Sequence, residues 1–359
     1  MTSRIPSHWA LRVSCMVAIC PILLRADLIA VNPPEIGSLP IITTAFVNGT
    51  TGDVYKDSYV FTLFDTGSTR VALDSATASF LGLTSGTLTT LRLNGLGAID
   101  PATLNAPIYT GAQAEIPNIG LQVTGLVDVP LIGAPVANQT LAKIDYTDTI
   151  TRGPYTSLNG ASISGPDITF YSGSNTPGYR PAIQLSLDPI GVAGTSNGID
   201  IGLTYLMYGV AFNEGPYTVA SATSGDLNLT PNRFLYDTGT NVTLIDSTLA
   251  TSLGLDLSSP DFHSYVGSDY LPGFYIDSLT MTGTGGTYTL KNVPILVGDT
   301  QGKTAVIGSN LFASTEVLFD GAGDTLGIGE QAVPEPSSVL LLAGVMVALI
   351  FLRRRALAG

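Results

Sequence analysis

The chain has 359 residues, with 15 Lys and Arg against 28 Asp and Glu, which gives a net charge of −13 at pH 7. This deficit of cations argues against a nucleic-acid partner, because phosphate binding needs a basic face. The 40 Gly, 22 Pro and only 12% charged residues predict short strands joined by tight turns, so we expect an all-β protein, long enough for two domains of the usual size.

Cysteine and histidine usage narrows the chemistry further. Both cysteines, Cys15 and Cys20, and one of the two histidines, His8, lie near the N terminus. The rest of the chain has no thiol and only His263, which stands in a polar context typical of a surface residue. We therefore expect no cysteine nucleophile, no metal site, no cofactor and no Ser-His-Asp triad.

The N terminus has the pattern of a secretory signal. Arg4 and Arg12 precede an apolar stretch at residues 13–24, and small residues at Ala26 and Ala30 offer cleavage positions. We predict a signal peptide over residues 1–30.

An acidic motif occurs twice, each time after an apolar strand. The first copy is Phe64-Asp65-Thr66-Gly67-Ser68 and the second is Tyr236-Asp237-Thr238-Gly239-Thr240, 172 positions later. Similar neighbours follow each copy: Asp74-Ser75 and Leu81-Gly82-Leu83 in the first, Asp246-Ser247 and Leu253-Gly254-Leu255 in the second. Asp-Thr-Gly alone is also a common turn sequence. The matching neighbours favour an internal duplication instead.

A second pair of segments repeats at an offset of 175. Leu131-Ile132-Gly133 leads to Asp145, and Val306-Ile307-Gly308 leads to Asp320. We expect Asp145 and Asp320 to be strand-end or turn residues. Each half thus contains an Asp-Thr-Gly turn and a later apolar-apolar-Gly step, which predicts two related lobes.

These segments resemble those of the aspartic peptidases, and in particular a two-lobed, pepsin-like member whose halves look like retropepsin units. The resemblance implies an all-β, bilobal fold with the active site at the lobe interface and with Asp65 and Asp237 as catalytic residues. It also implies that Thr66 and Thr238 hydrogen-bond across the interface, and that each apolar-apolar-Gly strand braces the loop of its own lobe.

The residue types suit this chemistry. Hydrolysis without a metal, a thiol or a histidine needs one group that takes a proton from water and another that gives one to the scissile carbonyl. Two facing carboxylates can do both, because they cannot both ionise and so share one proton. Gly67 and Gly239 would let the backbone pass close to the carboxylates. We expect the hydroxyls of Ser68 and Thr240 to donate to the outer carboxylate oxygens.

Other features of the pepsin-like pattern are weaker. Tyr109, in Ile108-Tyr109-Thr110-Gly111, lies 44 positions after Asp65 and is a candidate for the tip of a flap hairpin, although a strand tyrosine is more often a packing residue. The supporting tryptophan is absent, since Trp9 is the only one. The Gly-, Ser-, Asn- and Pro-rich residues 151–198 predict a lobe connection or a surface insertion.

The C terminus combines Val333-Pro334-Glu335-Pro336, an apolar run at residues 339–352 and three arginines at 353–355. This order resembles the PEP-CTERM sorting signal of Gram-negative bacteria, and a plain C-terminal anchor is the alternative. The resemblance implies processing by an exosortase-type enzyme. The run of 14 residues is short for a membrane span but can cross if its flanking residues snorkel, leaving the body outside.

We therefore predict a signal peptide at residues 1–30, an N-terminal lobe at 31–200, a C-terminal lobe at 201–332 and a sorting signal at 333–359. The predicted function is an exported, membrane-anchored or cell-surface aspartic endopeptidase acting on polypeptides. A non-catalytic surface or matrix protein that keeps the fold for binding is the alternative. We expect a monomer, because duplication supplies within one chain the pairing that single-unit relatives obtain by dimerising.

Overall fold

The computed structural model describes eleven stretches of the chain. These are residues 27–83, 88–93, 102–114, 119–123, 131–155, 161–171, 179–196, 199–223, 232–266, 269–300 and 302–330. Within these stretches no helix is long and apolar enough to cross a membrane. The apolar run predicted to span the membrane, residues 339–352, lies outside them, as does most of the predicted signal peptide.

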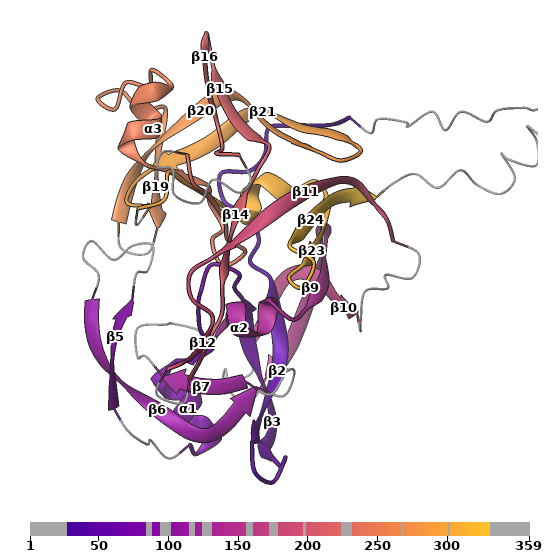
Figure 1. Cartoon of the computed structure of the whole chain (residues 1–359), viewed down its shortest axis with the longest axis vertical. Coiled ribbons are helices and arrows are strands. Elements are labelled where there is room, and N and C mark those ends of the chain that lie inside the picture. The colour runs from indigo at the N-terminus through magenta and orange to yellow at the C-terminus, as the bar shows by residue number, and fades with distance from the viewer. Residues whose placement is uncertain are drawn as a thin grey trace, which may run out of the picture.

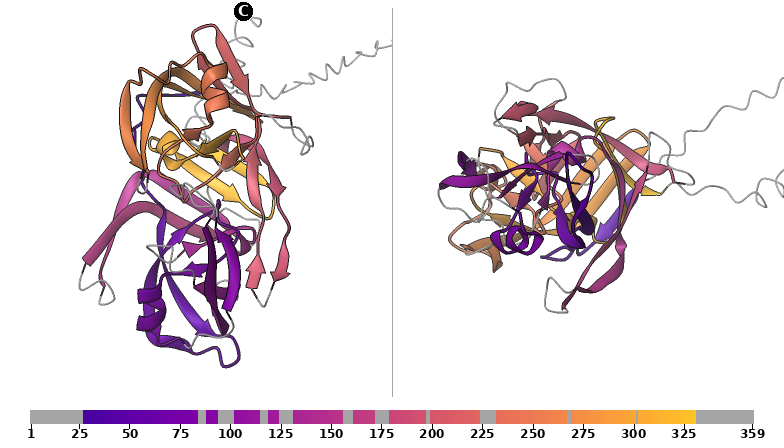
Figure 2. Two further views of the ribbon diagram at one scale, coloured as in Figure 1. Left: turned by 90° about the vertical axis from the view of Figure 1, so that its left-hand side faces the viewer. Right: turned by 90° about the horizontal axis from the view of Figure 1, so that it is seen from below.

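Strands dominate the molecule, so the predicted all-β class is confirmed. Two lobes lie one above the other, with the strands between residues 41 and 132 in the lower lobe and the strands between residues 204 and 307 in the upper one (Figures 1 and 2). The described short helices are α1 (Ser75–Leu81), α2 (Ala134–Ala137), α3 (Ser247–Ser252) and the 3-10 helix η2 (Ser309–Phe312).

The lower lobe is built on a sheet with seven described strands, in the order β2-β3-β8-β4-β7-β6-β5. Their bounds are β2 (Ile41–Asn48), β3 (Val54–Phe64), β8 (Leu131–Ile132), β4 (Ala72–Leu73), β7 (Ile119–Val123), β6 (Ala102–Ala114) and β5 (Leu88–Leu93). β3 and β8 pair in parallel, which places the strand before Asp65 beside the strand before Gly133.

The upper lobe has the same central pairing in a larger sheet. There β17 (Phe234–Tyr236) pairs in parallel with β22 (Ala305–Ile307), so the strand before Asp237 lies beside the strand before Gly308. The other described strands of this lobe are β14 (Thr204–Met207), β15 (Val210–Glu214), β16 (Tyr217–Ala220), β18 (Leu244–Ile245), β19 (Phe262–Val266), β20 (Asp269–Gly283) and β21 (Gly286–Val297).

Five strands in the order β10-β9-β23-β24-β11 extend this sheet between the lobes, and Figure 1 shows them there. They are β10 (Ala161–Tyr171), β9 (Leu141–Tyr155), β23 (Glu316–Asp320), β24 (Thr325–Glu330) and β11 (Pro181–Ile190). β9 comes from the first half of the chain and β23 from the second, and they pair directly. Much of the segment 151–198 is therefore ordered strand in the connection between the lobes.

Two short pieces complete the described fold. β12 (Gly194–Ser196) and β13 (Ile199–Ile201) form a separate two-stranded hairpin. β1 (Leu28–Val31) pairs in parallel with β21, so the N-terminal strand lies on the upper lobe before the chain enters the lower one. The predicted boundary between the lobes at residue 200 stays a prediction.

The repeated residues outside the motif are helix caps. Asp74 and Asp246 are the N-caps of α1 and α3, and their side chains accept hydrogen bonds from the amides of Thr77 (2.9 Å) and Leu249 (2.6 Å). Gly82 (φ 69°) and Gly254 (φ 75°) end these helices in the left-handed region. The sequence repeat thus encodes the same strand-turn-helix unit in each lobe.

Candidate active site

Asp65 and Asp237 occupy equivalent places, each directly after the last residue of a buried strand. The amide of Asp65 donates to the carbonyl of Ile132 (2.9 Å), and the amide of Asp237 donates to the carbonyl of Ile307 (3.2 Å). Each aspartate is therefore fixed by the apolar-apolar-Gly strand of its own lobe, as the resemblance implied.

The two carboxyl groups meet across the lobe interface. The glycine of each loop lies against the aspartate of the other lobe. A Cβ at Gly67 would lie 2.3 Å from Cγ of Asp237, and a Cβ at Gly239 would lie 2.4 Å from Cγ of Asp65. Any other residue at either glycine would push the two carboxyl groups apart.

Backbone amides hold the inner oxygen of each carboxyl group. Oδ1 of Asp65 accepts from the amides of Gly67 (2.9 Å) and Ser68 (3.0 Å), and Oδ1 of Asp237 accepts from the amide of Gly239 (2.8 Å). These bonds point each side chain toward the opposite lobe and favour its ionised form.

The two threonines lock the loops together. The amide of Thr66 donates to Oγ1 of Thr238 and the amide of Thr238 donates to Oγ1 of Thr66, both at 3.0 Å. Each hydroxyl then donates to a carbonyl of the other lobe, that of Tyr236 (3.2 Å) or Phe64 (2.7 Å). The predicted hydrogen bonds across the interface are therefore present, and both threonines are fully buried.

The outer oxygens are held unequally. The hydroxyl of Thr240 donates to Oδ2 of Asp237 (3.2 Å), as expected. The equivalent expectation for Ser68 is wrong, because its hydroxyl donates to the carbonyl of Arg70 (3.1 Å). The smaller serine turns into its own loop, and its amide binds Asp65 in place of its hydroxyl.

Burial and mutual repulsion set the protonation of the pair. Burial raises the pKa of Asp65 well above its ordinary value, and the charge of Asp237 and the hydrogen bond to it raise it further. Burial also raises the pKa of Asp237, but the amide of Gly239, the bond to Asp65 and the Thr240 hydroxyl oppose this rise. The pair therefore retains one proton in mildly acid solution, and its titration belongs to both carboxyls together.

A second glycine in each lobe, at the end of the apolar-apolar-Gly segment, packs closely against the aspartate loop. A Cβ at Gly133 would lie 2.0 Å from the carbonyl oxygen of Arg70, and one at Gly308 would lie 2.1 Å from that of Val242. The residue after each glycine donates to the aspartate loop, Ala134 to the carbonyl of Ser68 (2.6 Å) and Ser309 to that of Thr240 (2.9 Å).

Tyr109 does not occupy the predicted hairpin tip. It lies inside β6 and pairs with Leu121 of β7. The Thr110-Gly111 sequence beside it belongs to a bulge, since the pairing jumps from Tyr109 to Gln113 while β7 advances by one residue. β6 also pairs antiparallel with β5, from Leu93 opposite Ala102 to Leu88 opposite Pro107.

Asp145 and Asp320 lie on neighbouring strands of the sheet between the lobes, apart from the two carboxyls described above. Asp320 ends β23 and accepts from the amide of Gly323 (2.8 Å), as expected for a strand-end residue. Asp145 is instead inside β9, opposite Glu316. His263 is exposed and stacks on Tyr270, with ring centroids 4.9 Å apart.

One further repeated pair touches the site and was not predicted from the sequence. Ile36-Gly37 and Ile201-Gly202 lie 165 positions apart, and each glycine contacts an aspartate loop. Two residues are a weak signal on their own. The pair becomes visible only when the sequences before β2 and before β14 are compared with each other.

Comparisons with known proteins find two family models that match parts of the chain. A family model described as aspartyl protease matches residues 221–311, about a quarter of the chain, which includes Asp237 and Gly308 but not Asp65. A model described as the PEP-CTERM protein-sorting motif matches residues 332–355. A search of curated proteins finds no match to the chain.

Among solved structures, an aspartic proteinase from Irpex lacteus resembles the chain with a TM-score of 0.44 and 14% sequence identity. The likeness covers 84% of this chain and 99% of that one. The second half of the chain is thus similar to aspartyl proteases, and a match to the PEP-CTERM protein-sorting motif follows it.

Proposed function

We propose that the chain is an aspartic endopeptidase in which Asp65 and Asp237 hydrolyse peptide bonds. The observation that carries the proposal is the meeting of these two carboxyl groups at the lobe interface, where the glycine of each aspartate loop lies against the aspartate of the other lobe and the two threonines bond the loops together. A water held between them would give a proton to the ionised carboxyl as it attacks the peptide carbonyl. The protonated carboxyl would donate to the carbonyl oxygen, giving a tetrahedral intermediate without a covalent bond to the protein.

The surroundings of the pair support this division of roles. The Ser68 hydroxyl donates to the carbonyl of Arg70 and not to Asp65, which suits Asp65 as the proton donor. The Thr240 hydroxyl donates to Asp237 and stabilises its ionised form, which suits the proton acceptor. Burial of both loops keeps these interactions in a medium of low dielectric constant, where they are stronger than in water.

Asp237→Asn tests the proposal. It removes the proton acceptor but keeps the size of the side chain, so we expect a folded protein that no longer cleaves a denatured protein substrate between pH 3 and 7. Asp256→Asn changes an exposed carboxylate of the same lobe and should leave cleavage unchanged. Cleavage by the wild type should also be blocked by pepstatin.

Two results would contradict the proposal. Cleavage retained by Asp237→Asn would exclude this mechanism, and a wild type that cleaves nothing over the whole pH range would favour a binding protein that keeps the fold.

We also propose that the chain is exported from a Gram-negative cell, held at the membrane by residues 339–352 and processed near Pro334-Glu335 by an exosortase-type enzyme. The match of residues 332–355 to the PEP-CTERM protein-sorting motif supports this. The mass of the protein isolated from the cell surface tests the processing step, since an intact C terminus at Gly359 would contradict it. We propose a monomer, and sedimentation as a dimer would contradict that.

A further inference from the structure

The two repeated glycines, Gly37 and Gly202, make the same contacts in opposite directions. Gly37 precedes β2 of the lower lobe, yet its amide donates to the carbonyl of Asn241 in the upper lobe (2.6 Å). Gly202 precedes β14 of the upper lobe, and its amide donates to the carbonyl of Thr69 in the lower lobe (3.0 Å). Thr69 and Asn241 each lie four residues after an aspartate, so each glycine is bonded to the aspartate loop of the other lobe.

Both glycines are also packed against the residues that directly follow the apolar-apolar-Gly segment of that other lobe. A Cβ at Gly37 would lie 2.4 Å from the amide nitrogen of Asn310 and 2.6 Å from the carbonyl carbon of Ser309. A Cβ at Gly202 would lie 2.3 Å from both the carbonyl carbon of Ala134 and the nitrogen of Pro135. Only glycine fits at such distances, because the neighbouring atoms are backbone and cannot rotate away.

Three residues further on, each segment joins the aspartate strand of its own lobe. The carbonyl of Pro40 accepts from the amide of Phe64, directly before Asp65 (2.9 Å). Tyr205 pairs with Tyr236, directly before Asp237. We name residues 37–40 and 202–205 the bridging segments, since each runs from the aspartate loop of one lobe to the aspartate strand of the other.

The bridging segments are short, so they limit the distance between the aspartate loop of one lobe and the aspartate strand of the other. Four residues in extended conformation span about 10 Å between the first and last Cα. Two such connections, running in opposite directions on the two lobes, leave little freedom for one aspartate loop to move relative to the other.

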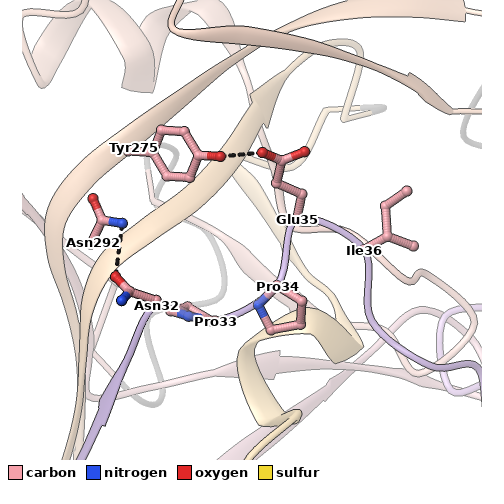
Figure 3. Close-up of a pocket in the computed structure, with 7 residues that line it drawn as sticks. All are labelled: Asn32, Pro33, Pro34, Glu35, Ile36, Tyr275 and Asn292. Atoms are coloured by element: carbon pink, nitrogen blue, oxygen red, sulfur yellow. Dashed lines mark hydrogen bonds between the residues drawn. The ribbon is translucent and has the colours of Figure 1, made fainter.

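The first bridging segment is also anchored upstream. Figure 3 shows residues 32–36 lying along the upper lobe, where the side chain of Asn292 donates to that of Asn32 (3.0 Å) and the hydroxyl of Tyr275 donates to Glu35. Together with Ile36 these residues line an open cavity of about 530 Å³. With β1 paired to β21, the strap of residues 28–36 holds Gly37 in place on the upper lobe.

We infer that Gly37 and Gly202 are positioning residues that set the separation of Asp65 and Asp237 through the two bridging segments. The inference rests on the proposed function, because the separation matters only if the two carboxyls share a proton. An added methyl group at either glycine has to move the segment away from the opposite loop by about 1 Å to reach ordinary contact distance. A displacement of this size at a reacting pair can lower kcat by about 100-fold.

The experiment compares Gly37→Ala and Gly202→Ala with Gly283→Ala. Gly283 is an equally crowded glycine, since its Cβ would lie 2.2 Å from the carbonyl oxygen of Gln184, but it is in β20 and touches neither aspartate loop. The two carboxyls are titrated by carbon-13 NMR of aspartate-labelled full-length protein, which needs no catalytic activity. We expect the two apparent pKa values to move closer together in Gly37→Ala and Gly202→Ala and to stay apart in Gly283→Ala, although all three lower Tm.

Unchanged titration in both bridging variants would overturn the inference. A second measurement covers the case in which they do not fold. In the wild type, the amides of Gly37 and Gly202 should exchange with solvent as slowly as those of Thr66 and Thr238. Exchange as fast as that of the exposed turn amide of Thr50 would also overturn it. Absent cleavage by the wild type would count against the proposed function alone, since neither readout depends on cleavage.

Discussion

Thr240 and Ser68 stand at equivalent positions but do different things. The Thr240 hydroxyl binds the outer oxygen of Asp237, whereas the Ser68 hydroxyl binds a carbonyl of its own loop. The two lobes therefore differ at the level of a single side chain, and the difference favours the negative charge of the shared-proton pair on Asp237.

Thr240→Val tests this asymmetry. The change keeps the shape of the side chain and removes a hydrogen bond to an ionised group, which is worth about 1.5 kcal/mol or more. One pKa unit corresponds to about 1.4 kcal/mol, so we expect the acid limb of the kcat/KM profile to move about one unit toward neutral pH. Ser68→Ala is the matched control and should leave that limb in place. Equal shifts in both variants would show that the two hydroxyls act alike.

At the scale of single residues, the sequence predicted those that belong to the repeated motif. The repeat located Asp65 and Asp237, and small loop residues beside them predicted a close approach. It could not predict the orientation of a hydroxyl, because a serine and a threonine in the same motif have the same donor. It also could not predict that the glycine of each loop packs on the aspartate of the other lobe, which is a contact between segments 172 positions apart.

Among the elements, β1 bears on where the chain is processed. Leu28 to Val31 pair with residues 288–291 of β21, and the amide of Asn32 donates to the carbonyl of Lys291 (3.1 Å). The side chain of Asp27 accepts from the amide of Thr287 (3.2 Å). Cleavage after Ala30 would remove most of this strand, whereas cleavage after Ala26 would keep all of it.

We therefore expect the mature protein to begin at Asp27. Sequencing the N terminus of the exported protein measures this directly. The sequence offered Ala26 and Ala30 as equivalent small residues, and only the pairing of β1 separates them. A mature N terminus at Val31 would show that β1 is not part of the exported fold.

The structure of two other elements could not be predicted from the local sequence pattern. Thr110-Gly111 had the composition of a turn, but a bulge inside a long strand uses the same residues, so Tyr109 was misplaced. The Gly- and Pro-rich residues 151–198 have the composition of a connection or an insertion, yet much of this segment forms strands that pair with β9, β14 and β24. Of these partners β24 lies far away in the sequence, and local composition does not report a pairing of that kind.

At the scale of the whole molecule, the pairing of β9 with β23 brings charged side chains from the two halves of the chain into contact. Glu316 of β23 lies opposite Asp145 of β9, and Lys143 contacts both, at 3.0 Å from Glu316 and 3.9 Å from Asp145. The Lys143 ammonium also lies over the ring of Tyr179, 5.4 Å from its centroid. Two carboxyl groups therefore lie beside a single ammonium group in this contact.

The pKa directions give this contact a pH dependence. Burial raises the pKa of Glu316; the hydrogen bond and charge of Lys143 oppose the rise, and the Asp145 carboxylate adds to it. Burial also raises the pKa of Asp145, but the bonds to Thr147 and Glu316 and the charge of Lys143 outweigh it and leave it lowered. The Glu316 contribution is complete below the ordinary glutamate pKa and is lost as pH rises through the raised value. The Asp145 contribution is lost only in stronger acid.

Glu316→Gln should therefore reduce the loss of Tm between pH 4 and pH 7. Glutamine imitates the protonated carboxyl, so the variant should match the wild type near pH 4 and be the more stable of the two at pH 7. Each unit by which the pKa is raised corresponds to about 1.4 kcal/mol, or about 2–4 °C in Tm for a domain of this size. Glu330→Gln, an exposed change on β24 of the same sheet, is the control. The pH dependence that comes from Asp65 and Asp237 is common to all three proteins and cancels in the comparison. A variant whose Tm falls with pH in parallel with the wild type would show that ionisation of Glu316 does not weaken the fold.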